Sequence, residues 1–204
     1  MDIGRCFNEA LDVYKRNWGI LALAALLYEI LTLLSLTILA GPLSGGICLM
    51  SIQAMRRPDK RIELGDMFRA FNQFLPLVGL FYLTLIPMMF ASLIFIVPGI
   101  LLSAVWLFAF FLVVDLGECV FSSMSRSYEV TTRNEFRNYF LLALISFALS
   151  LAPSAIPYVG FVAAWFLMPL AWLLETAAYL QAFDEKKPPV VAAPQISTEQ
   201  RPAS

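Results

Sequence analysis

Three carboxylates in apolar surroundings are the side chains of this sequence best placed to do chemistry. Glu29 and Glu175 lie inside long apolar stretches, and Asp115 ends another. A carboxylate in such surroundings is strongly disfavoured as a bare anion unless it is paired, neutralised by a proton, or hydrated. It can therefore carry a proton, bind a cation, or hold two helices together through an ion pair.

Asp115 and Glu175 occupy similar places in two successive segments. Asp115 follows Pro98 by 17 residues, and Glu175 follows Pro157 by 18. Arginines of a neighbouring amphipathic segment can neutralise both carboxylates; the candidates are Arg126, Arg133 and Arg137. We favour this structural pairing. The alternative is a hydrated vestibule on the cytoplasmic side that binds an ion or a cationic group.

Glu29 lies about 11 residues into the first apolar stretch, beside Tyr28 and one helical turn before Thr32. Three roles are open for it. Protonated and hydrogen-bonded to a neighbouring helix, it would be structural. As a deep carboxylate it could instead hold a proton or a cation, or it could contact a partner subunit.

The sequence lacks the residue patterns that other catalytic, phosphate-binding or metal-binding sites require. The sequence contains no histidine, and Cys6, Cys48 and Cys119 are too far apart to form a CxxC pair. There is no Ser-His-Asp set, no phosphate-binding loop followed by GK[ST], and no acidic cluster spaced for a divalent metal. We therefore expect three buried thiols and a protein that is not an enzyme, with no cofactor and no metal.

The elements that must position the carboxylates are apolar and long. Hydrophobic residues make up 60% of the chain and charged residues only 14%, well below a usual soluble domain. A membrane crossing needs roughly 20 apolar residues. Six stretches come close, and the second is the shortest; they are residues 18–39, 43–55, 75–97, 99–114, 139–155 and 158–182. The fold class is therefore an all-α membrane bundle of about six helices.

Turns rich in Pro and Gly pair these stretches into hairpins over residues 18–55, 75–114 and 139–182. The expected turn residues are Pro42, Pro98, Gly99, Pro157 and Gly160. All 14 Lys and Arg residues lie outside these turns. Because short loops rich in Lys and Arg stay in the cytoplasm, both termini are expected there, in a cell inner membrane.

An amphipathic segment precedes each hairpin. The segments begin near Ile3, Leu64 and Phe121, and each places aromatic and aliphatic residues on one helical face and charges on another. Such helices lie in the headgroup plane or pack under a bundle. The pattern predicts one membrane domain, residues 1–183, built from three copies of one unit. The polar, proline-rich segment 184–204 is expected to be a disordered cytoplasmic tail.

Part of the chain resembles a known family. The residues that carry the resemblance are Ile96-Val97-Pro98-Gly99-Ile100, Trp106, Val113-Val114-Asp115 and segment 125–131. They are similar to the bacterial membrane domain associated with glycerophosphodiester phosphodiesterases, over about residues 60–183. The resemblance implies a six-helix bundle with interfacial helices. The catalytic barrel of that family is missing, so it implies an anchoring or accessory role and no phosphodiesterase activity.

Two functions follow from these features. The first is a non-enzymatic inner-membrane module that scaffolds or modulates other membrane proteins or specific lipids. The alternative is a small transporter or exporter that uses the intramembrane carboxylates. The lipid bilayer is the expected environment, and the net charge of −1 gives no reason to expect a nucleic-acid partner.

Overall fold

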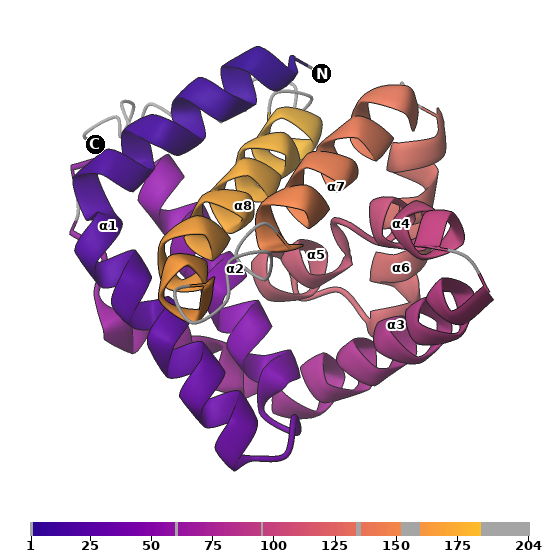
Figure 1. Cartoon of the computed structure of the whole chain (residues 1–204), viewed down its shortest axis with the longest axis horizontal. Helices are drawn as coiled ribbons and strands as arrows, with labels where there is room; N and C mark the ends of the chain where they lie inside the picture. Colours follow the sequence, from indigo (N-terminus) through magenta and orange to yellow (C-terminus); the bar gives the residue numbers. More distant parts are fainter. Residues whose placement is uncertain (1, 60, 95, 134–135, 152–159, 185–204) are drawn as a thin grey trace, which may run out of the picture.

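The computed structural model describes residues 2–59, 61–94, 96–133, 136–151 and 160–184. These residues form helices and no strand, which confirms the all-α class (Figure 1). The elements in chain order are α1 (Ile3–Leu34), α2 (Ala40–Arg56), the 3-10 helix η1 (Leu64–Gln73), α3 (Phe74–Ile94), α4 (Ile96–Val105), α5 (Ala109–Leu116), α6 (Val120–Arg133), α7 (Phe136–Leu151) and α8 (Gly160–Phe183).

Four helical segments are long and apolar enough to cross a membrane: Ile3–Leu34, Leu64–Leu93, Pro98–Leu116 and Ala163–Phe183. The chain is thus built as a membrane protein, but six spans are not confirmed. α7 is apolar and shorter, with 16 residues, and α2 has 17. Both are short enough to depend on their neighbours for burial.

The first amphipathic segment does not form a separate interfacial helix. It continues without interruption into the first apolar stretch, so that α1 runs for 32 residues along one side of the molecule (Figure 1). No proline interrupts this segment, which explains the continuity. α1 packs chiefly on α8 through small and aliphatic side chains, including Cys6, Ala10 and Ala24.

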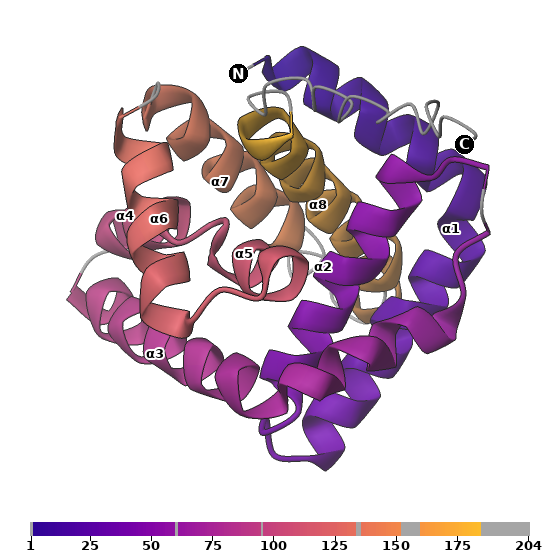
Figure 2. The same ribbon diagram turned by 180° about the vertical axis from the view of Figure 1, so that it is seen from behind.

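α2 lies in the centre of the bundle, beside α8 (Figure 2). Its glycines allow close packing: a Cβ atom on Gly46 would lie 2.0 Å from the backbone oxygen of Met67, and one on Gly41 would lie 2.4 Å from that of Leu77. Small residues let helix backbones approach closely in membranes. This close approach brings η1 and α3 against α2.

Two of the expected turns are shifted along the chain. The turn after α1 covers Ser35–Leu39, and Pro42 lies in the first turn of α2. Pro98 and Gly99 likewise lie in the first turn of α4. A proline is tolerated in a first helical turn because the missing N–H has no partner there. The prediction of Pro42, Pro98 and Gly99 as turn residues was therefore wrong by a few positions.

The fourth apolar stretch is divided into α4 and α5 by a break at residues 106–108. The hydroxyl of Ser127 on α6 donates to the Val105 carbonyl at 2.8 Å and accepts from the Phe108 N–H at 3.1 Å. Thr131 Oγ1 lies 3.3 Å from the same carbonyl. α6 thus satisfies backbone groups that the break leaves without helical partners.

α6 buries a face of small polar residues, which are Ser123, Ser127 and Thr131. The aromatic stripe faces outward instead, with Phe121 77% and Tyr128 55% exposed. The hydrogen bonds at the break explain this orientation, because only hydroxyls can supply them. α7 and α8 follow, and Gly160 is the first residue of α8. Pro157 and residues 185–204 lie outside the described residues.

The glycine packing of α2 gives a direct test. Gly46→Ala should lower the free energy of unfolding by about 1–3 kcal/mol, the usual result of overpacking, because the new methyl group meets backbone that cannot rotate away. Thermal unfolding in mild detergent measures it.

Gly79→Ala on α3 is the matched control, because nothing lies within 4 Å of its added Cβ. It should leave stability unchanged or raise it by about 0.5–1 kcal/mol. Equal unfolding temperatures for the two variants would contradict the packing described.

Candidate functional site around Glu175

Asp115 forms an ion pair, but with Arg56 and none of the expected arginines. The guanidinium of Arg56 donates to Asp115 Oδ1 at 2.5 Å and to Oδ2 at 2.8 Å. It also donates to both oxygens of Asp184, at 2.8 and 2.9 Å, and the Tyr179 hydroxyl donates to Asp115 Oδ2 at 2.8 Å. We call these four residues the Arg56 cluster. It joins the C-terminal ends of α2, α5 and α8.

Arg56 stays positively charged within the cluster. The hydrogen bonds that Arg56 donates to Asp115 are the main reason that the pKa of Arg56 lies above its ordinary value, while partial burial acts in the opposite direction. Two fork-shaped contacts to carboxylates are geometrically specific as well as strong. The cluster therefore serves as a fixed structural clamp.

A simple signal in the sequence points to this cluster. Arg56, Asp115 and Asp184 are the first charged residues after three of the apolar stretches. Ends of helices that face the same side can meet, so these three were candidates for pairing with one another. The expectation of pairing across to the third amphipathic segment overlooked Arg56.

The three predicted arginine partners lie elsewhere. Arg126 pairs with Glu118 and lies over the Phe183 ring, 5.3 Å from its centroid. Arg133 pairs with Glu129 at 2.6 Å on the surface of α6. Arg137 is exposed at the start of α7. The predicted pairing of Asp115 or Glu175 with these arginines was wrong, because α6 presents its hydroxyls to the bundle and its charges outward.

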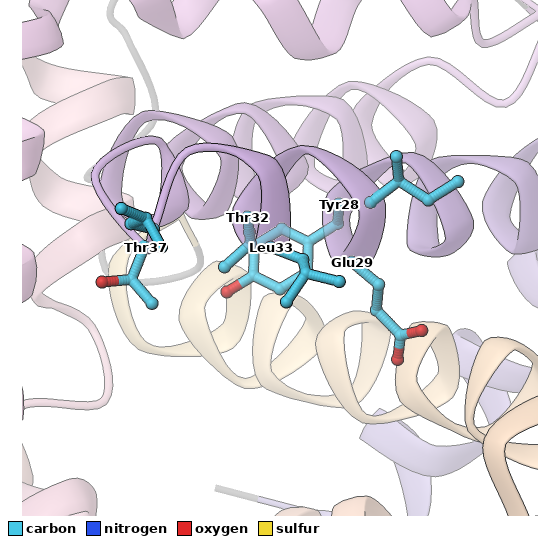
Figure 3. Close-up of a pocket in the computed structure, with 7 residues that line it drawn as sticks. Tyr28, Glu29, Thr32, Leu33 and Thr37 are labelled. Carbon is cyan, nitrogen blue, oxygen red and sulfur yellow. The ribbon is translucent and has the colours of Figure 1, made fainter.

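Glu29 is hydrogen-bonded to a neighbouring helix. Trp165 Nε1 on α8 donates to Glu29 Oε2 at 2.7 Å. Figure 3 shows the carboxylate extending from α1 toward α8, at one end of a cavity of about 540 Å³. The described lining of this cavity is largely apolar and comes from the end of α1 and the following turn, where Leu36 and Thr37 have positive φ angles.

Glu175 lines a second cavity, of about 290 Å³. Residues from distant parts of the chain form its wall. The lining residues are Tyr28 from α1, Ser44, Ile47 and Cys48 from α2, Phe81, Thr84, Leu85 and Met88 from α3, Leu107, Phe110 and Phe111 around α5, and Trp172 and Glu175 from α8. The part of Glu175 that remains exposed faces this cavity.

Glu175 has no cationic partner within the part of the chain that the structure describes. Ser146 on α7 is a polar neighbour of Glu175, but its buried hydroxyl makes no hydrogen bond among the described residues. Glu175 thus differs from Asp115 and Glu29, which both have strong partners.

Tyr28 lines both the cavity beside Glu29 and the cavity beside Glu175. Its hydroxyl lies 3.3 Å from Ser44 Oγ on α2, and its ring packs edge-on against Trp172 at 5.8 Å between centroids. Tyr28 is therefore held by both polar and aromatic contacts. The two glutamates line different cavities, and Tyr28 belongs to the wall of both.

The cavity around Glu175 combines one carboxylate with a mostly apolar and aromatic wall. A single carboxylate with no paired cation can hold a proton or attract a cation. No group of three or more His, Cys, Asp or Glu side chains gathers as a metal site in the described ranges. Such an arrangement can accommodate a proton or one small cation.

The Arg56 cluster predicts a stability difference between two carboxylates. Asp115→Asn should lower the free energy of unfolding by about 1.5–3 kcal/mol, because the negative charge opposite Arg56 and one of the two acceptor oxygens are lost where only 11% of the Asp115 side chain is exposed. Glu129→Gln is the control, since its pair with Arg133 is exposed and contributes at most about 1 kcal/mol. Chemical unfolding in detergent compares the two, and equal losses would contradict the role of the cluster.

Glu29 gives a second prediction. Glu29→Gln retains an oxygen acceptor for the Trp165 N–H, so stability should change little, whereas Glu29→Leu leaves that donor unpaired and should lower stability by about 1–3 kcal/mol. Thermal unfolding distinguishes the variants. A large loss in Glu29→Gln would show that the charge itself, and not the hydrogen bond, is required.

Comparisons with known proteins indicate no function, so the functional interpretation rests on the geometry of the site. No family model, curated protein or solved structure matches the chain. The resemblance to the membrane domain associated with glycerophosphodiester phosphodiesterases therefore stays an expectation from its residue motifs.

Proposed function

We propose that this chain is a small membrane carrier that binds a cation in the cavity around Glu175. One observation carries the proposal: Glu175, a carboxylate without a cationic partner in the described structure, lines a cavity between helices. Ionisable residues inside membrane proteins commonly mark ion or substrate pathways. The proposal is non-enzymatic and corresponds to the transporter alternative drawn from the sequence.

Two features of the structure support movement of a solute through this site. Leu107, in the break between α4 and α5, lines the cavity, and broken helices are common at the binding sites of transporters. A further cavity lies on the other side of Tyr28, toward the turn between α1 and α2. A change in the Tyr28 rotamer would open a path between the two cavities.

We also propose that both termini face the cytoplasm of a bacterial inner membrane. The distribution of Lys and Arg motivates this orientation. Contacts support a common side for the two ends: the Asp2 N–H donates to Gln181 Oε1 at 3.2 Å, and Asp184 binds Arg56. In this orientation the Arg56 cluster lies at the cytoplasmic ends of α2, α5 and α8.

The scaffold role is the second candidate. The exposed Phe121 and Tyr128 on α6 favour it, because aromatic side chains at the edge of a membrane bundle can contact lipid headgroups or another membrane protein. Mild-detergent purification followed by mass spectrometry tests it. Loss of a co-purified protein or lipid in a Phe121→Ser variant would support this role, and recovery of the chain alone would contradict it.

The carrier predicts a flux that depends on Glu175. Purified protein is placed in liposomes that contain a pH-sensitive dye, and sodium, potassium, guanidinium or tetramethylammonium chloride is added outside. At least one cation should exchange for internal protons and raise the internal pH, because one carboxylate can be neutralised by either. Glu175→Gln should slow this flux at least about tenfold, the change produced by 1.4 kcal/mol.

Glu129→Gln, which alters an exposed carboxylate, is the control and should retain the flux. The proposal fails when folded wild-type protein leaves the internal pH unchanged with every cation in the panel.

A further inference from the structure

We infer that the ligand of the Glu175 cavity is a small organic ammonium ion, with alkyl groups on its nitrogen, in preference to an inorganic cation. This inference rests on the proposed function, since it names the ligand class of the same cavity. It depends on what surrounds the carboxylate, which is a separate observation from the carboxylate itself.

The wall of the cavity is aromatic. Five of its lining residues carry aromatic rings: Tyr28, Phe81, Phe110, Phe111 and Trp172. The faces of aromatic rings attract cations, and this attraction is strongest for Trp and for cations that are removed from water. Quaternary and alkylated ammonium ions are recognised in proteins by such rings together with an anionic group. One carboxylate among five aromatic side chains has this composition.

The same cavity offers few oxygen ligands to an inorganic ion. Hard cations require several oxygens close to the metal. Besides Glu175, the side-chain oxygens are the hydroxyls of Tyr28, Ser44 and Thr84. Tyr28 and Ser44 contact one another, and Thr84 donates to the Leu80 and Phe81 carbonyls at 2.9 and 3.0 Å. A dehydrated sodium or potassium ion would therefore lose its water without gaining an equivalent shell.

The volume limits the size of the ligand. A cavity of about 290 Å³ lies at the lower end of the range of about 300–1,000 Å³ that is typical of small-molecule sites. It suits a compact ammonium ion with methyl or ethyl groups and excludes large multi-ring cations. Ile47, Leu85 and Met88 supply the apolar contacts for such alkyl groups.

Equilibrium binding to the full chain in lipid nanodiscs tests the ligand class. Tritiated choline is the probe, and its competitors are tetramethylammonium, potassium, and 3,3-dimethylbutan-1-ol, which replaces the charged nitrogen with carbon. Tetramethylammonium should displace choline, and the neutral alcohol and potassium should each be at least tenfold weaker. Comparable displacement by the alcohol or by potassium would overturn the inference, as would absence of choline binding to folded protein.

Variants of the aromatic wall separate a cation contact from general packing. Trp172→Leu should weaken choline binding about fivefold to thirtyfold, whereas Trp172→Phe, which keeps an aromatic face, should lose less. Trp18→Leu is the control, since Trp18 lies outside the cavity and is 55% exposed. Phe110→Leu replaces Trp172→Leu if the latter does not fold. Equal affinities for the Leu and Phe variants would overturn the aromatic contribution.

The two proposals fail in different ways. Choline binding without flux of any cation would remove the carrier and leave the ligand class intact. Cation flux in liposomes together with equal binding of choline and the neutral alcohol would retain the carrier and overturn the ligand class.

Discussion

The guanidinium of Arg56 sets the constraint on which the interior of this molecule depends. It binds Asp115 and Asp184 together, so the ends of α2, α5 and α8 must meet at one point. The same three helices contribute much of the wall of the Glu175 cavity, a few turns further into the bundle. The Arg56 cluster holds the three helices together at one end. Further along, the helices can remain apart around the cavity, because no side chain fills the space between them.

Close packing elsewhere in the bundle offsets the packing contacts that are missing around the cavity. The glycines of α2 bring η1 and α3 within backbone contact, and the Ser127 hydroxyl completes the hydrogen bonds at the break between α4 and α5. Both devices use small or polar residues where a larger apolar side chain would keep the elements apart. The result is a bundle with dense contacts around α2 and a cavity beside it.

The three carboxylates of the apolar segments show three solutions to one energetic problem. Asp115 binds Arg56, and Glu29 accepts a hydrogen bond from Trp165. Glu175 has neither kind of partner within the described structure and faces the cavity instead. A protein can satisfy a carboxylate with its own groups or leave it for a ligand, and only the second arrangement provides a binding site. The proposed cation site follows from this contrast.

Much of the architecture could be predicted from local pattern. Apolar length predicted a helical membrane protein, in agreement with the four long apolar helical segments. The boundaries were less accurate, because Pro42 and Pro98 are compatible with both a turn and a first helical turn. The break at 106–108 contains no Pro or Gly, so nothing in its own sequence could reveal it. It depends on hydroxyls at least 19 residues away.

The sequence by itself determined that Glu29, Asp115 and Glu175 needed partners, since the penalty for a bare charge depends only on its apolar surroundings. Only the tertiary structure decided which partners Asp115 and Glu29 have, and that Glu175 faces a cavity instead. Arg56 lies 59 residues from Asp115, and Trp165 lies 136 from Glu29, so no local spacing encodes these pairs. The cavity around Glu175 is a property of helix packing for the same reason, because its wall combines side chains from α1, α2, α3, α5 and α8.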